Sequence, residues 1–145
     1  MLLFVRYLDE VRFILPDEDE KIWSKKGDDA SSKVLENDIP LGIWEVFRLD
    51  GEIPTDKLDK DQSGQYSYEL IIAVPEVENI SELNPSPLFS YFPTEISLPL
   101  PVVCHATLEL DQSRNHVHHR SSNRYVFDCL AEFLAEVAEK YGSVD

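Results

Sequence analysis

Apolar and polar residues alternate along several short stretches of the chain, which is the pattern of β-strands with one buried face. The clearest stretch is residues 65–74, where every second side chain is aromatic or aliphatic. Ile71 and Ala73 add apolar side chains on the opposite face, which indicates a strand in the middle of a sheet. Pro75 ends the predicted strand, because proline has no N–H group to donate to a neighbouring strand.

Shorter strands are predicted on both sides of this one. Their expected ranges are 11–15, 21–24, 32–36, 43–49 and 102–110, and turn-forming residues recur about every ten positions in the first half, as in an antiparallel meander. Apolar residues before the first range also fit one face of a short helix. Trp23 and Trp44 lie in predicted strands and are expected in the core. In the last range Cys104 is expected to face the core, and the opposite face of a half-buried strand carries His105, Thr107 and Glu109.

Two segments are predicted to lie outside regular structure. Residues 50–64 are mostly charged and turn-forming, and they are expected to form a mobile surface excursion. Residues 76–101 carry several prolines and are expected to be irregular.

The C-terminal part of the chain predicts a long helix. Apolar residues recur there at the i, i+3, i+4, i+7 spacing of a helix face that lies on a core, from Val126 to Tyr141. Gly142 suits the position after the helix end, and the candidate caps for its start are Ser121, Ser122 and Asn123. The predicted fold is α+β: one domain over residues 1–145, with a mostly antiparallel sheet of about five or more strands covered by a long C-terminal helix.

The charge balance narrows the choice of partners. Asp and Glu number 28 against 13 Lys and Arg, which gives a formal net charge of −15. Such a chain repels phosphate backbones and anionic lipid, so neither nucleic acid nor a membrane is an expected partner. No run approaches the roughly 18 apolar residues that span a bilayer, and the N-terminus lacks a signal-peptide pattern. The two cysteines, Cys104 and Cys129, fall in a predicted strand and helix as free thiols, so a cytoplasmic location is expected.

Familiar catalytic motifs are missing from the sequence: it has no phosphate-binding glycine loop, no nucleophile elbow and no zinc-protease helix. The histidine cluster His116, His118 and His119 lies in a predicted loop before the helix. Neighbouring loop side chains rarely converge on one ion, so no metal site is expected. A small metal-dependent enzyme built on these three histidines is the alternative interpretation.

The segment 111–115 is the stronger candidate for chemistry. It follows a predicted strand directly, and a guanidinium held there could pair with a phosphate through two hydrogen bonds. Arg114 is the guanidinium of this segment, and from the residues alone the favoured interpretation is an ordinary exposed arginine. Arg120 and Arg124 are near enough in sequence to compete for the same role.

The order of motifs in the second half of the chain resembles a known family. Residues 88–95, 98–102, 105–110 and 113–115 follow the run found after the ATPase domain of sacsin-like members of the GHKL superfamily, which are relatives of the ninety-kilodalton heat-shock chaperones. The resemblance is sharpest over residues 88–141. It implies a middle, or transducer, segment in which a sheet has helices on one side.

The resemblance also implies a function for the loop. In that family a loop arginine reaches the terminal phosphate of ATP held by the preceding domain, and here this role falls to Arg114, flanked by Ser113 and Asn115. The chain itself lacks the family's nucleotide-binding half, so it is expected to be a fragment that binds no cofactor alone and does no chemistry alone. ATP and Mg²⁺ would belong to the intact protein, whose N-terminal nucleotide-binding domain is the expected partner.

A second interpretation needs no ATP. The acidic surface, the charged segment 50–64 and the lack of a catalytic motif are also typical of a free-standing protein–protein interaction module.

Overall fold

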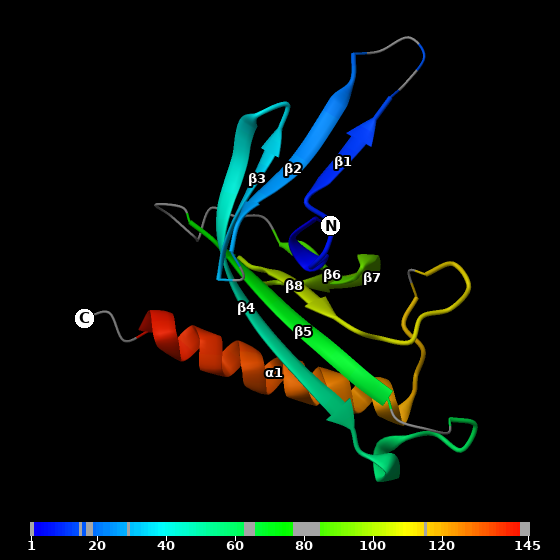
Figure 1. Ribbon diagram of the computed structural model, residues 1–145. Helices are drawn as coiled ribbons and strands as arrows, with labels where there is room; N and C mark the ends of the chain where they lie inside the picture. The colour runs from blue at the N-terminus through cyan, green and yellow to red at the C-terminus, as the bar shows by residue number, and fades with distance from the viewer. Residues whose placement is uncertain are drawn as a thin grey trace.

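The computed structural model describes residues 2–14, 16, 19–28, 30–62, 66–76, 85–114 and 116–142. The described residues form an α+β fold in which one curled sheet of eight strands carries a single long C-terminal helix (Figure 1), as the sequence predicts. The strand order is β1-β2-β3-β4-β5-β8-β6-β7. All described neighbours pair antiparallel apart from β6 and β8, which are parallel.

The strands are β1 (Glu10–Phe13), β2 (Lys21–Gly27), β3 (Ser31–Glu36), β4 (Ile39–Ile53), β5 (Tyr66–Pro75), β6 (Ser86–Ser90), β7 (Phe92–Leu98) and β8 (Val103–Ala106). The helical elements are the single turns η1 (Leu2–Phe4) and η2 (Thr55–Lys57), and the helix α1 (Ser121–Gly142). The N-terminal helical pattern is therefore only one turn long. The last predicted strand is also shorter than its 102–110 pattern, because the chain leaves the sheet after Ala106.

The prediction that residues 76–101 are irregular is wrong for their described part. Residues 86–98 form the β6–β7 hairpin, whose β7 is the outer strand of the sheet. An outer strand tolerates proline because one of its sides needs no N–H donor. Pro93 lies in this outer strand, and Pro87 lies beside an irregularity in the β6 pairing. The prolines therefore mark an edge hairpin.

The main core lies between α1 and one face of the sheet. The inward side chains of β5 are Tyr68, Leu70, Ile72 and Val74, and they pack with Leu88, Cys104, Ala106, Val126, Leu130, Phe133 and Val137. Figure 1 shows α1 running along β4 and β5. Both cysteines are free, and burial raises the pKa of the Cys104 thiol to about 12. None of the described helices has the length and apolar character needed to cross a membrane.

The opposite face of the sheet has a smaller core of its own. Leu3 and Phe4 from η1 pack on Val46, Ile71 and Ala73, which makes β5 buried on both faces as predicted. His105 lies on this face and is fully buried, so its predicted place on the exposed face of a half-buried strand is wrong. The cause is η1, whose Phe4 ring stacks on the imidazole at a centroid distance of 5.3 Å.

Burial of His105 makes stability depend on pH. Desolvation and then the Arg48 charge lower its pKa from 6.5 to about 4, and Nδ1 accepts a hydrogen bond from Tyr91 N–H at 3.2 Å. Between these values only the unfolded chain takes up the proton, so stability falls as the pH drops. We expect the free energy of unfolding to be about 2 kcal/mol lower at pH 5 than at pH 7. Urea titrations would measure this, and His105→Gln should flatten the dependence; an equally steep profile in His105→Gln would contradict it.

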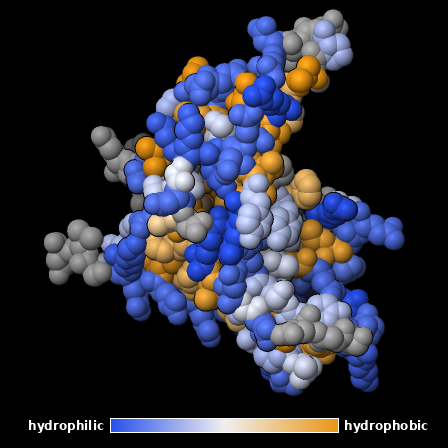
Figure 2. Space-filling view, in the orientation of Figure 1, coloured by the Kyte–Doolittle hydropathy of each residue, from blue (hydrophilic) through white to orange (hydrophobic). Residues whose placement is uncertain are grey.

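The prediction that both tryptophans lie in the core is only partly right. Trp44 is half-buried beside the smaller core, whereas Trp23 keeps 39% of its surface exposed. The strands β1, β2 and β3 extend away from α1, which does not cover them (Figure 1). The surface in view in Figure 2 is mostly hydrophilic, with apolar side chains in separate patches.

Candidate functional site

The candidate loop is built as a short hairpin between β8 and α1. Leu110 and Val117 form an isolated antiparallel bridge at its base. On either side of this bridge, Asp111 N–H donates to the His116 carbonyl at 3.0 Å, and His118 N–H donates to the Glu109 carbonyl at 3.1 Å. The loop therefore has a paired stem and a tip whose described residues are 112–114.

Asp111 organises the tip. Its carboxylate accepts hydrogen bonds from the Ser113 hydroxyl at 2.6 Å and from His116 N–H at 3.4 Å. Its carbonyl accepts from Arg114 N–H at 3.0 Å, which closes a tight turn. The Ser113 hydroxyl, followed by the backbone N–H of His116, keeps the pKa of Asp111 below its ordinary value. The tip is thus held by an ionised side chain of the loop itself.

Arg114 projects from this turn. Its φ is 61°, a left-handed conformation that non-glycine residues adopt uncommonly, and its side chain is exposed. Within the described part of the chain no carboxylate forms an ion pair with Arg114. Ser113 precedes it in the chain, and the Ser113 hydroxyl donates a hydrogen bond to the Asp111 carboxylate. Asn115 lies outside the described residues.

Arg120, one of the two competitors, is already engaged. Its guanidinium pairs with Asp61 at 2.7 Å and with Glu109 at 2.7 Å, and the Asp61 hydrogen bond raises its pKa most strongly. Arg124 is exposed on the first turn of α1, and no ion pair joins it to another described residue. Arg114 and Arg124 are therefore the two arginines near the loop that are open to an outside anion.

Residues 50–62 are docked on the molecule, so the predicted mobile excursion is wrong for this range. The first four residues complete β4. Further on, Asp59 accepts a hydrogen bond from Ser121 N–H at 3.0 Å, and Gln62 donates to the Ser122 hydroxyl at 3.3 Å and also to Glu109. A carboxylate near the first turn of a helix satisfies free N–H groups and complements the helix dipole.

The predicted helix caps are also wrong, because a side chain from the 50–62 segment reaches the start of the helix. Ser121, Ser122 and Asn123 all lie inside α1, and the side chain that reaches its first N–H group comes from Asp59, far away in sequence. Gly142 is likewise the last helical residue and does not follow the helix.

Asn123 instead joins the two sides of the loop stem. Its Oδ1 accepts from Glu109 N–H at 2.9 Å, and its Nδ2 donates to the carbonyls of Glu109 and His118, both at 2.9 Å. Only 3% of its surface is exposed. Sequence reasoning missed this role, because nothing in the local pattern distinguishes such an asparagine from a helix cap.

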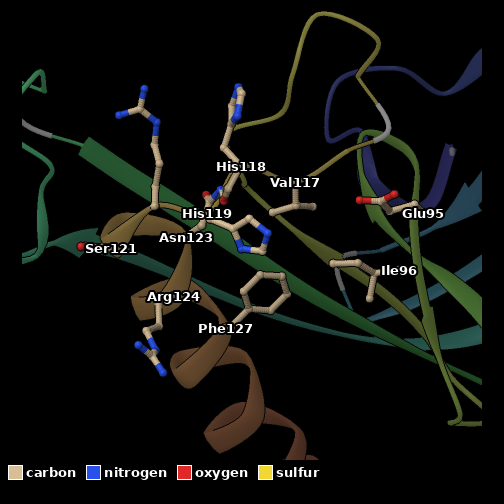
Figure 3. Close-up of a pocket in the computed structure, with 10 residues that line it drawn as sticks. Glu95, Ile96, Val117, His118, His119, Ser121, Asn123, Arg124 and Phe127 are labelled. Carbon is tan, nitrogen blue, oxygen red and sulfur yellow. Dashed lines mark hydrogen bonds between the residues drawn. The ribbon is translucent and has the colours of Figure 1, made fainter.

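A hollow of about 660 Å³ lies between the loop stem, β7 and the start of α1 (Figure 3). Figure 3 shows Ile96, Val117, His119 and Phe127 around one space, whereas His118 and Arg124 point away from it. His116 contacts the Glu95 carboxylate instead. The three histidines thus diverge, and no group of three possible metal ligands converges among the described residues.

Comparison of this chain with protein-family models, with curated proteins and with solved structures finds no match. The GHKL resemblance therefore stays a prediction that rests on the sequence motifs.

Proposed function

We propose that this chain is a non-catalytic coupling segment, of the transducer type, in a cytoplasmic ATP-driven chaperone-like protein. In this proposal Arg114 contacts the terminal phosphate of an ATP that a separate nucleotide-binding domain holds together with Mg²⁺. Ser113 and Asn115 flank the contact. The chain supplies a positioned cation and performs no reaction alone.

The observation that carries the proposal is the presentation of Arg114. A turn fixed by the Asp111 carboxylate carries the guanidinium outward, and no described carboxylate neutralises it in a chain with a net charge of −15. Phosphoryl transfer builds negative charge that a pre-positioned guanidinium stabilises strongly. An acidic chain that presents an unpaired arginine on a hydrogen-bonded loop turn is suited to such an outside anion.

The arrangement of the resembling motifs gives further support. Residues 88–95 and 98–102 belong to the β6–β7 hairpin and the turn after it, and β6 pairs with β8 at Phe89 and His105. The Arg114 loop then follows β8 and leads into α1. The described residues of these motifs therefore lie on β6, β7, β8 and the loop after β8, on one side of the sheet.

The size of the native protein tests the proposal directly. An antibody against this chain, used on an immunoblot of source cells, is expected to detect a protein far larger than 16.7 kDa. A band at 16.7 kDa would reject the proposal that the chain is a coupling segment within a longer ATPase chain, because such a segment shares its polypeptide with the nucleotide-binding domain.

The second candidate is the free-standing acidic interaction module. The observation in its favour is the row of exposed carboxylates on the outer side of α1, formed by Asp128, Glu132 and Glu136. Such a row suits a basic partner whose binding weakens as salt screens the charges. A pull-down from cells is therefore expected to recover a basic protein at about 0.05 M salt and to release it at about 0.5 M salt. A pull-down in which no bound basic protein is released over this range would reject the candidate.

A further inference from the structure

The strand β1 is one open edge of the sheet. It lies at the end of the strand order, and no other described strand pairs with its outer side. Figure 1 shows β1 beside β2 in the part of the sheet that extends away from α1. An exposed edge presents unpaired N–H and C=O groups, which are a template for another strand.

The backbone pairing identifies which residues offer these groups. Lys25 N–H donates to the Asp9 carbonyl at 2.7 Å, so odd-numbered residues of this strand hydrogen-bond to β2. The pairing of Asn37 N–H with the Ile22 carbonyl at 2.8 Å agrees, because it shows that even-numbered residues of β2 face β3. The backbone groups of Glu10 and Arg12 therefore point outward.

We propose that β1 pairs antiparallel with β1 of a second copy, about a two-fold axis that passes beside Val11. The interface is isologous, so each copy contributes the same four residues. The sheet would then run continuously through both copies. This inference does not depend on the proposed function.

The register follows from the outward groups and the charges. In an antiparallel pair, residues that exchange two hydrogen bonds must both point toward the partner. With the axis at Val11, Glu10 lies opposite Arg12 of the second copy and Arg12 lies opposite its Glu10, so all outward groups are paired. Registers centred on Glu10 or on Arg12 would instead place two like charges opposite each other, which is destabilising.

The remaining side chains of β1 add apolar contact. Val11 and Phe13 lie on the other face of the strand, where they line an apolar groove of about 300 Å³ with Trp23. Phe13 is 42% exposed and packs edge-on against Trp23 at a centroid distance of 5.3 Å. In the two-fold pairing Val11 meets Val11 of the second copy, and each Phe13 is diagonal to it, within reach of an aromatic ring.

A charge-swap series tests the pairing by sedimentation velocity over a range of protein concentrations in 0.15 M salt. The unmodified chain is expected to form dimers. Glu10→Arg and Arg12→Glu each place like charges opposite one another twice, and each is expected to weaken self-association about tenfold or more. An equimolar mixture of the two variants restores both opposite-charge pairs, so it is expected to form heterodimers. The double variant Glu10→Arg/Arg12→Glu should dimerise like the unmodified chain.

Two controls separate the pairing from overall charge. Glu136→Arg on α1 and Lys60→Glu in the 58–62 segment change the net charge as the β1 variants do, at exposed positions outside β1. Neither is expected to alter the dimer. Circular dichroism checks that every variant is folded. A strictly monomeric chain, dimers in the single variants, or a mixture that stays monomeric would each overturn the proposal.

Discussion

Under the proposed coupling function, replacing Arg114 with alanine in the intact protein is expected to lower ATP turnover roughly 10²–10³-fold, with little change in nucleotide affinity. The guanidinium would act on charge that develops at the terminal phosphate during transfer, whereas binding of ATP depends on the nucleotide-binding domain. Alanine and arginine both carry a Cβ, so the left-handed backbone conformation at this position costs them a similar amount of energy. The substitution should therefore leave the turn and the fold intact. Steady-state turnover and equilibrium nucleotide binding, measured on the same preparations, give both quantities.

Matched variants define what the Arg114 result means. Arg114→Lys keeps a positive charge without the planar fork, so it should recover only part of the turnover. Arg124→Ala removes the other unpaired arginine near the loop, and Lys60→Ala removes an exposed charge elsewhere. Both are expected to retain turnover. Unchanged turnover in Arg114→Ala would reject the assignment, and a large loss in Arg124→Ala alone would transfer the role to that residue.

Replacing Asn123 with leucine is expected to lower the free energy of unfolding of this chain by about 3 kcal/mol. The two side chains have similar volume, but leucine leaves the Glu109 N–H without its partner and removes one of the two hydrogen bonds that each of the carbonyls of Glu109 and His118 accepts. Each buried polar group that loses its hydrogen bond costs about 1–3 kcal/mol, and part of this cost is recovered where water reaches the loop. Urea titration followed by tryptophan fluorescence measures the difference.

The neighbouring residue provides the control for Asn123. Ser121 is exposed and joins the Asp59 contact through its backbone N–H, so Ser121→Ala should change stability by less than about 0.5 kcal/mol. Asn123→Asp keeps the acceptor for Glu109 N–H but turns an oxygen toward two carbonyls, so it should be as harmful as leucine. Stability within about 0.5 kcal/mol of the unmodified chain in Asn123→Leu would show that the stem does not depend on this residue.

The elements that the sequence predicted well are those whose pattern is complete within the element. α1 and β5 bury wide apolar faces, and their spacing alone indicates helix and strand. The β6–β7 hairpin was not predicted, because its stability depends on pairing with β8 and because prolines interrupt the strand pattern of its sequence. The burial of His105 could not be predicted from the sequence either, because it depends on contact with a helical turn about a hundred positions earlier in the chain.

The same limit applies to the candidate site. The sequence placed Arg114 correctly in a loop after the last strand, because strand and helix patterns bracket it. It left Arg120 as a competitor for the same role, since Asp61, a carboxylate that neutralises it, comes from a segment predicted to be mobile. Pairing over such sequence separations is decided by the three-dimensional packing and leaves no periodic signal.

The long strand β4 divides its pairing between two parts of the sheet. Its residues between 39 and 45 pair with β3 and residues 44–53 pair with β5, so the two pairings overlap at Trp44 and Glu45. Backbone hydrogen bonds from Val46 N–H to the Ala30 carbonyl and from Glu76 N–H to the Ile43 carbonyl extend this short overlap by one residue at each end. Proteins open in cooperative units whose boundaries fall where few hydrogen bonds cross. Amide protons of β1, β2 and β3 are therefore expected to exchange with solvent through a local opening that leaves β5, β8 and α1 protected. A chain of this size can thus behave as two units of unequal stability within one continuous sheet.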